Sequence, residues 1–348
     1  MKDLDTLAYD PEFEPGARNA VFTCLAVKPG ERAVLITDDE CLPIGAALLR
    51  QLREAQAEVA AFVLEEHVQR PTTVLPEPIA EALEQADVSV FAARAQRGEL
   101  PSRIAMTAIV NRRRIRHGHM VNITPRIMVE GMRADFRRVD ALCRWVLTRV
   151  RPARTMTATS PAGTRLTASF SPDIRWIPTS GIIGREKWGN LPGGEVFTSP
   201  ARVDGVFVVD GVLGDWLANK YGRMADNPLR ITIEDSRIVD LSCSRAEIVD
   251  DFRAYTSADE NSNRVGELAL GTNLALRDVI GQILQDEKLP GLHIAFGHPY
   301  AEHTGATWSS TSHIDVVGRH FDIDFDGEPL LRDSRFLVDA DALAPSGS

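Results

Sequence analysis

The sequence has 348 residues, of which 44% are hydrophobic and 25% are charged, and its formal net charge is −10. This composition is typical of a folded globular protein and excludes a disordered or fibrous one, and the length is sufficient for two domains. No uncharged apolar run approaches the length of about 18 residues that a membrane-spanning helix requires, so we expect no membrane partner.

The N-terminus and the cysteines predict a cytoplasmic protein. The first residues, MKDLDTLAYDPEFEPGARNA, are acidic and lack the apolar stretch of an export signal. The cysteines have no CxxC spacing and are scattered along the chain, as Cys24, Cys41, Cys143 and Cys243. We interpret them as reduced thiols, which are typical of a cytoplasmic compartment.

In chain order, the first half alternates strand-like and helix-like segments. Apolar runs predict strands over residues 31–37, 58–64, 87–93 and 119–124, and helical spacing predicts helices over 43–57, 76–86, 101–112 and 126–150. Buried strands that alternate with helices favour an α/β fold with a mostly parallel, open sheet. No GxGxxG or GxxxxGK[ST] motif occurs, so this sheet alone does not predict nucleotide binding.

Arginine is concentrated at the end of this first half. Residues 103–154 contain thirteen arginines but only three acidic residues, Glu130, Asp135 and Asp140. A nucleic-acid or phosphate site is one interpretation of this charge. A solvated helix face or a contact with another subunit is the other, and we favour it because no aromatic stacking residues surround the run NRRRIRHGH. We therefore expect no nucleic-acid partner.

The second half has a different pattern, which predicts a β-rich domain. RTMTATSPAGTRLTASF, residues 154–170, is typical of a hairpin, and short strands joined by Asp-Gly or Asp-Ser turns are expected over 202–211, 229–242 and 320–331. Helix is expected over 257–273 and 276–287. We therefore predict an α/β domain over residues 1–151 and a β-rich α+β domain over residues 152–348.

Histidine is sparse but clustered near the end of the chain. Five of the eight histidines lie between residues 293 and 320. His313 and Asp315 are two residues apart in a strand-like run, so their side chains should lie on one face of a sheet and offer two ligands to one cation. The pair alone is common, and a purely structural role is the better interpretation unless other ligands join it.

Three further residues are candidates to join this pair. Glu195 in GNLPGGEVFTSP and Glu267 in RVGELALGTN have apolar neighbours, and a buried carboxylate is costly unless it is paired or binds a metal. His293 ends a strand-like run before Gly297. Five oxygen and nitrogen ligands exceed what a structural zinc site needs, and no cysteine is among them. A two-metal hydrolytic site fits this set better, and the second domain is therefore expected to bind metal.

Four short blocks, NLPGGEVFTSP, VGELALGTN, HIAFGHPY and SHIDVVG…DGEPL, resemble in order the signature blocks of the thermophilic metallo-aminopeptidases, the aminopeptidase T or leucyl-aminopeptidase-like family. The resemblance covers the second domain well and the first only in its strand–helix pattern. It implies a homodimer with two divalent cations, usually zinc or cobalt, although such ligands also accept manganese or iron. The residues it implies as metal ligands are Glu195, Glu267, His293, His313 and Asp315, and it implies Tyr300 as the active-site tyrosine.

The chain departs from this family in one segment. Residues 301–312, AEHTGATWSSTS, form a shorter loop than the family's longer, glycine-rich and acidic one. This shortening puts the substrate preference in doubt. His298 and His303 do not match family ligands by position, and we interpret them as exposed loop residues.

The hypothesis that follows is a metallo-aminopeptidase-like hydrolase that cleaves an N-terminal peptide or amide bond with metal-activated water. Glu195 or Glu267 would act as the base, and Tyr300 would donate a hydrogen bond to the oxyanion. The rival hypothesis is a mononuclear non-heme iron(II) ring-cleaving dioxygenase that uses His293, His313 and Asp315, since the sequence also resembles, more distantly, the 2,5-dihydroxypyridine dioxygenases. Retention of both glutamates favours hydrolysis. A non-catalytic binding protein is a third interpretation.

Overall fold

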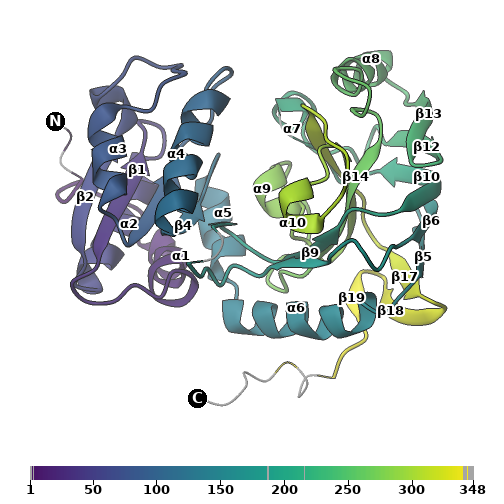
Figure 1. Ribbon diagram of the computed structural model, residues 1–348, viewed down its shortest axis with the longest axis horizontal. Coiled ribbons are helices and arrows are strands. Elements are labelled where there is room, and N and C mark those ends of the chain that lie inside the picture. The colour runs from purple at the N-terminus through teal and green to yellow at the C-terminus, as the bar shows by residue number, and fades with distance from the viewer. Residues whose placement is uncertain (1, 3, 186–187, 215, 340–342, 344–348) are drawn as a thin grey trace. The chain divides into compact units, whose positions relative to one another are not determined.

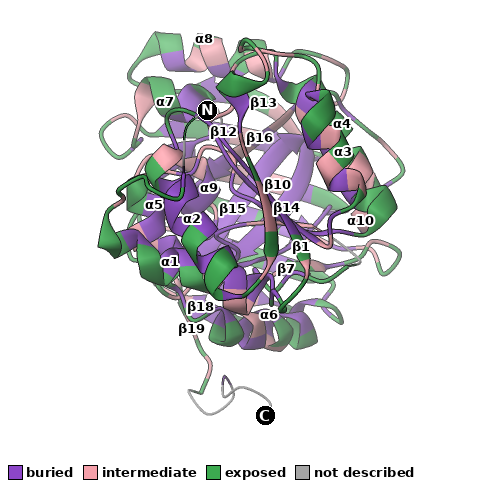
Figure 2. Cartoon of the chain, turned by 90° about the vertical axis from the view of Figure 1, so that its left-hand side faces the viewer, coloured by how far each residue is buried: buried purple, intermediate pink, exposed green. Residues whose placement is uncertain are grey.

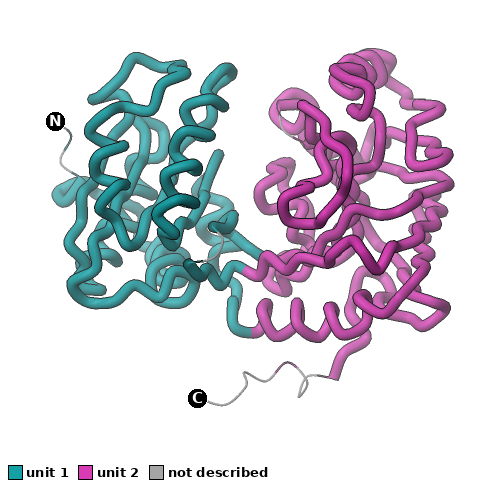
Figure 3. The backbone as a smooth tube through the Cα atoms, in the orientation of Figure 1, with its two compact units in different colours: residues 1–137, 181–193 teal, residues 138–180, 194–348 magenta. Residues whose placement is uncertain are grey.

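The computed structural model describes all residues except 1, 3, 186–187, 215, 340–342 and 344–348, and it divides the chain into two compact units. Unit 1 contains residues 1–137 and 181–193, and unit 2 contains residues 138–180 and 194–348, coloured teal and magenta in Figure 3. Within these described residues, every helix is too short or too polar to cross a bilayer.

Unit 1 is built on a five-stranded parallel sheet with the strand order β2-β1-β3-β4-β8. The strands are β1 (Arg32–Thr37), β2 (Glu58–Val63), β3 (Val88–Ala92), β4 (Arg116–His119) and β8 (Gly189–Asn190). The longer helices are α2 (Leu42–Glu54), α3 (Glu77–Glu84) and α4 (Leu100–Arg113), and they connect the first four strands (Figure 1). The predicted α/β class and parallel sheet are confirmed. The apolar runs that predicted β1 and β3 are buried almost throughout because a parallel sheet is covered on both faces.

Shorter elements complete unit 1. They are η1 (Pro11–Phe13), α1 (Glu14–Arg18), η2 (Asn19–Cys24), η3 (Leu64–Glu66), α5 (Pro125–Val129) and η4 (Gly131–Arg133). The predicted strand over 119–124 lies earlier, in β4, whose sequence RHGH is polar but buried and therefore gives no hydrophobic signal.

The long helix predicted over residues 126–150 is wrong in its first part. Residues 126–133 belong to α5 and η4, and the main helix, α6 (Phe136–Val150), begins later. Ala134 has an extended backbone, and the carboxylate of Asp135 accepts a hydrogen bond of 3.1 Å from the backbone N–H of Arg137. An acidic side chain that satisfies a free N–H is a usual start of a helix, so the break is set locally.

Unit 2 contains two antiparallel sheets, as predicted for a β-rich domain. The larger has the order β13-β12-β10-β6-β5-β17-β18-β19, and the smaller has the order β11-β16-β15-β14-β9-β7. The strands of the larger sheet are β5 (Thr155–Thr159), β6 (Arg165–Ser169), β10 (Arg202–Val209), β12 (Leu229–Glu234), β13 (Arg237–Ser242), β17 (Asp322–Phe325), β18 (Glu328–Arg332) and β19 (Arg335–Phe336). The predicted hairpin over 154–170 is the pair β5–β6.

The smaller sheet carries the candidate site. Its strands are β7 (Ile177–Thr179), β9 (Glu195–Thr198), β11 (Val212–Leu213), β14 (Val265–Gly271), β15 (Gly291–Gly297) and β16 (His313–Val317). Figure 2 colours β14 as buried, in agreement with the burial of all seven of its residues.

The helical prediction for residues 257–287 is wrong for most of its length. VGELALG forms β14, and because this strand is buried on both faces its apolar residues do not alternate as in a half-exposed strand. Only α9 (Ile283–Asp286) is helical in the later part. The carboxylate of Asp286 accepts hydrogen bonds from the backbone N–H groups of residues 280–282 and holds the preceding loop. The other described helices of unit 2 are α7 (Trp216–Tyr221), α8 (Ala246–Tyr255), α10 (Ala301–Thr304) and most of α6.

Candidate metal centre

The strand register brings the five predicted ligands to one face of the smaller sheet. Directly paired residues of an antiparallel sheet point to the same side. Glu267 on β14 pairs with Ala295 on β15, which pairs with Asp315 on β16. Three further pairs on this face are His313 with Gly297, His293 with Ala269, and Glu195 with Gly271.

The opposite face of these strands is apolar and forms core. Its buried side chains are Val196, Leu268, Leu270, Leu292, Ile294, Phe296, Ile314 and Val316. Alternation therefore separates core from ligands in each strand. On the ligand face, alanine and glycine stand between the polar residues. Gly297 has φ +101°, and a Cβ there would lie 2.1 Å from the carbonyl oxygen of Ser312, so the strand end before the HPY segment needs glycine.

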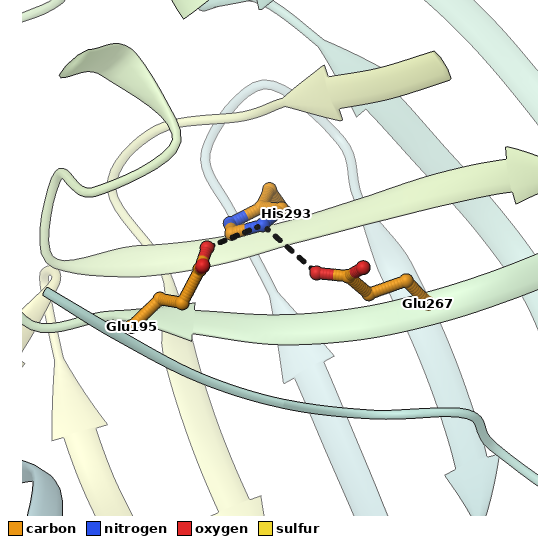
Figure 4. Close-up of side chains that lie close together, drawn as sticks. All are labelled: Glu195, Glu267 and His293. Carbon is orange, nitrogen blue, oxygen red and sulfur yellow. Dashed lines mark ion pairs between the residues drawn. The ribbon is translucent and has the colours of Figure 1, made fainter. Parts of the chain in front are cut away.

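The ligand atoms of Glu195, Glu267 and His293 lie within 4.8 Å of one another, close enough to share a cation. Nε2 of His293 is 3.6 Å from Oε2 of Glu195, 3.7 Å from Oε1 of Glu267 and 4.0 Å from Oδ1 of Asp315 (Figure 4 shows the two glutamate contacts). Nε2 of His313 is 3.4 Å from Oδ2 of Asp315 and 3.9 Å from Oε2 of Glu267. Ligands to one zinc ion lie about 3–4 Å apart, because each is about 2.0–2.2 Å from the metal.

Two details of the histidines support a cation rather than direct hydrogen bonds. Nε2 of His293 is buried and has no hydrogen-bond partner among the described residues. Nδ1 of His313 lies 3.0 Å from the carbonyl oxygen of His298 and must donate to it, so Nε2 is the nitrogen that faces the carboxylates and that a cation would bind in place of a proton. The residues present therefore fit a divalent metal ion.

Comparison with known proteins agrees with this geometry. The model of the family described as thermophilic metalloprotease (M29) matches residues 144–319, about half of the chain, and this span includes all five predicted ligands. The chain belongs to the M29 family. The family resemblance predicted from the four sequence blocks is thereby confirmed, and the predicted class, a hydrolase of the metallopeptidase type, agrees with it.

Two known proteins, AmpS and AmpT, are similar to this M29 chain. Aminopeptidase AmpS of Bacillus subtilis (strain 168) is 27% identical to it over 199 residues, which are 50% of this chain and 47% of AmpS, so the match spans about half the length of that relative. Wild-type AmpT from Thermus thermophilus shares the fold with a TM-score of 0.69 and 19% identity, over 95% of this chain and 100% of AmpT.

A second solved structure has the same fold. The 2,5-dihydroxypyridine dioxygenase from Pseudomonas putida KT2440 superimposes with a TM-score of 0.69 and 17% identity, over 94% of this chain and 98% of the dioxygenase. At 17% and 19% identity, the similarity to the dioxygenase and to AmpT shows only that the three proteins share a fold. The fold is therefore compatible with both hypotheses drawn from the sequence.

The electrostatics of the M29 site show an excess of negative charge. Burial raises the pKa of Glu267 above its ordinary value. Burial lowers the pKa of His313, but the charge and hydrogen bonding of Asp315 outweigh this effect and raise that pKa to about 10. The pKa of His293 is also raised, because Glu267, Glu195 and Asp315 outweigh its burial. Without metal, the site therefore attracts protons to its histidines.

Sequence reasoning missed two residues of the site, Glu287 and Lys288. Glu287 offers a carboxylate oxygen within 4.8 Å of ligand atoms of His293 and Asp315, and burial raises its pKa to about 8. Nζ of Lys288 is 2.8 Å from Oε2 of Glu195 and 2.6 Å from Oε1 of Glu287. The only sequence signal was their place just ahead of the His293 strand, in QDEKLPGLHI, where a charged pair is usually solvated.

Tyr300 lies beside the ligands. Its ring centroid is 4.8 Å from that of His313 and 5.8 Å from that of Phe197. Its backbone is left-handed, with φ 48°, which is uncommon for a bulky residue and often marks a functional position. Burial and the surrounding carboxylates, first of them Glu267, raise the pKa of the phenol well above its ordinary value, so the hydroxyl keeps its proton and can donate it in a hydrogen bond.

Proposed function

We propose that this chain is a metal-dependent aminopeptidase or a related amide hydrolase. The observation that carries the proposal is the buried Nε2 of His293, which faces three carboxylates at 3.6–4.0 Å without a hydrogen bond. A cation completes such an arrangement, whereas an unpaired group buried there is costly. Membership of the M29 family and similarity to the aminopeptidase AmpS support the reaction.

The cation ligands we propose are those expected from the sequence, namely Glu195, Glu267, His293, His313 and Asp315, and the sequence predicts two cations, zinc or cobalt first and manganese or iron as alternatives. When bound, a divalent cation lowers the pKa of water and polarises the scissile carbonyl.

Glu267 is the better of the two candidate bases. Its pKa is raised by burial, which makes its carboxylate a stronger proton acceptor. Burial raises the pKa of Glu195 as well, but Lys288 and His293 outweigh this and lower it overall. We therefore propose that Glu267 accepts the proton of the attacking water, while a free substrate amine is held by an acidic side chain of the cluster. Binding of that amine restricts cleavage to the N-terminal residue of a peptide or a similar amide.

Tyr300 is proposed to stabilise the oxyanion. Its ring lies next to the rings of His313 and Phe197, and its raised pKa keeps the hydroxyl protonated. One such donor contributes about 2.7–4 kcal/mol to a tetrahedral transition state.

The test of this function pairs metal content with turnover. Protein purified without added metal is analysed for bound metals and assayed for release of p-nitroaniline from amino-acid p-nitroanilides. Chelator-sensitive release with bound divalent metal is the expected result. Metal-loaded protein that releases no product from peptide or amide substrates would contradict the proposal.

A ring-cleaving dioxygenase is the second candidate, and one contact favours it. Because the ammonium of Lys288 pairs with Glu195, the ligands left are His293, His313, Asp315 and Glu267, and the first three are the two histidines and one carboxylate that bind iron(II) in mononuclear oxygenases. The dioxygenase from Pseudomonas putida has the same fold. One iron per chain with oxygen uptake on an aromatic substrate would establish this function and displace hydrolysis.

The homodimer and the cytoplasmic location stay predictions from the sequence. Size-exclusion chromatography with light scattering tests the first: a homodimer has twice the chain mass of 38.3 kDa.

A further inference from the structure

Lys288 is an unusual component of a metal centre, because it places a permanent positive charge inside the ligand cluster. Its side chain is 1% exposed, and its Nζ makes ion pairs of 2.8 Å with Glu195 and 2.6 Å with Glu287. Lysine is almost never buried without such partners. Its single charge therefore offsets one of the two negative charges of the acids that it pairs with.

The contact with Glu195 uses the oxygen that a metal beside His293 would need. Oε2 of Glu195 is 2.8 Å from Nζ of Lys288 and 3.6 Å from Nε2 of His293. The other oxygen, Oε1, accepts a hydrogen bond of 2.6 Å from the hydroxyl of Thr179. A cation bound between Glu195 and His293 would therefore lie next to the ammonium group, and the two positive charges would repel each other.

Lys288 reaches both groups of described residues whose ligand atoms lie close enough to hold a cation. One group is Glu195, Glu267 and His293, and the other is Glu287, His293 and Asp315. Each group includes an acid that pairs with Lys288, so the ammonium group competes with a cation in both.

We propose that Lys288 takes the place of a second cation, so that this chain binds one divalent metal ion, held by His293, His313, Glu267 and Asp315. The contacts of the two imidazoles with Glu267 and Asp315 are 3.4–4.0 Å long and use both oxygens of each carboxylate, and the two ion pairs of Lys288 are with other residues. Glu195 and Glu287 hold the ammonium group. The inference rests on the proposed metal-dependent function and reduces the two cations predicted from the sequence to one.

The backbone around Lys288 holds the side chain at this position. The Lys288 N–H donates to the carbonyl of Gln285 at 2.9 Å, and its carbonyl accepts from the N–H of Asn273 at 3.0 Å. At Gly271, the end of β14, a Cβ would lie 2.0 Å from the carbonyl oxygen of Leu289, so this segment packs directly against the strand. The ammonium group therefore cannot leave without a rearrangement of the site.

The experiment counts zinc ions per chain in the metal-free full-length protein by isothermal titration and by equilibrium dialysis with elemental analysis. We expect one ion in the wild type, two in Lys288→Met, and one in Lys288→Arg, which retains the charge. Lys220→Met is the matched control, since Lys220 pairs with Asp251 at the surface and its loss should leave the count at one.

Two ions in the wild type, or one ion in folded Lys288→Met, would overturn the inference. If Lys288→Met fails to fold, the wild-type count decides alone. The count is independent of turnover, so the two proposals can fail separately. One bound ion without hydrolysis of any peptide or amide supports the role of Lys288 and contradicts the peptidase, whereas no bound ion contradicts both.

Discussion

Glu99 in unit 1 and Glu267 in unit 2 are equally buried, each with 5% of its surface exposed, but their surroundings differ. Both oxygens of Glu99 accept hydrogen bonds from Arg70, at 2.8 and 2.7 Å, and one also accepts from the N–H of Gln96 at 3.0 Å. The oxygens of Glu267 lie 3.7 and 3.9 Å from the imidazoles of His293 and His313, beyond hydrogen-bond distance.

The pKa values of the two glutamates record this difference. Burial raises the pKa of Glu99, but the hydrogen bonds from Arg70 and Gln96 outweigh it and lower that pKa overall. Burial raises the pKa of Glu267, and its neighbours do not compensate. Burial alone therefore does not identify a functional carboxylate. The carboxylate of Glu99 has its donors within the protein, whereas that of Glu267 lacks such donors, as we propose for a metal ligand.

The largest expected effect separates the two glutamates by activity. Glu267→Gln should lower kcat by about 10²–10⁴-fold, because the amide cannot accept a proton from water. Glu99→Gln should leave kcat per folded molecule unchanged. Steady-state assays with an amino-acid p-nitroanilide, alongside metal analysis, measure both. Unchanged turnover in Glu267→Gln with bound metal would remove this residue from the mechanism.

The free energy of unfolding should depend strongly on the buried ion pairs of Arg70 in unit 1. Arg70→Met leaves the buried carboxylates of Asp38 and Glu99 unpaired and should lower the free energy of unfolding by about 3–5 kcal/mol. Arg18→Met, which breaks an exposed pair with Glu54, should change it by no more than about 1 kcal/mol. Urea denaturation gives both values. Equal losses in the two variants would show that the Arg70 cluster is not a structural centre.

Added metal should stabilise the protein through unit 2 alone. Zinc at ~100 times its Kd should raise the free energy of unfolding by about 2.7 kcal/mol. Arg70→Met should keep this increment, and His293→Gln should lose most of it. Thermal denaturation with and without zinc is the measurement. An increment that survives in His293→Gln would place the bound ion elsewhere.

The last prediction concerns the pH dependence of the metal-free protein. The folded pKa of His313 is raised from 6.5 to about 10 and that of Glu287 from 4.5 to about 8. Stability from a raised pKa is present at low pH and is lost as pH rises toward the folded pKa. Both contributions therefore fall between pH 6.5 and 8, each by at most about 1.4 kcal/mol per pH unit.

Glu99 should behave in the opposite way, since its pKa is lowered and its contribution is lost only as pH falls below the ordinary value of 4.5. Saturating metal should remove the part of the loss between pH 6.5 and 8 that comes from His313, because the cation replaces its proton, whereas Glu287 pairs with Lys288 and should keep its part. Chemical denaturation at several pH values, with and without zinc, tests this. A metal-free protein that becomes more stable as pH rises over that range would contradict the raised pKa values of His313 and Glu287.

The candidate ligands on the strands could be predicted from the sequence, but the loop residue Lys288 beside them could not. Spacing placed His313 and Asp315 on one face of a strand, and apolar neighbours singled out Glu195 and Glu267. Lys288 was not predictable, because its burial depends on contacts between segments that are distant in the sequence, such as the approach of Leu289 to Gly271. Sequence periodicity reports on one element at a time and cannot show such contacts.

The strands were likewise predictable only in part. Apolar runs identified β1 and β3, but the same kind of run over residues 265–271 wrongly predicted helix, since a strand buried on both faces does not alternate. In β4 the buried residues are Arg116, His117 and His119, whose polarity hides the strand. Their burial is explained by tertiary partners, for example Ser89, whose hydroxyl lies 2.8 Å from Nδ1 of His117.

A crystal soaked in zinc, with an anomalous difference map recorded at the zinc edge, tests the central claim most directly. We predict a peak about 2.0–2.2 Å from Nε2 of both His293 and His313, at ligand distance from the carboxylates of Glu267 and Asp315. An empty cluster, or zinc bound only at other sites of the chain, would contradict a metal centre on this face of the sheet.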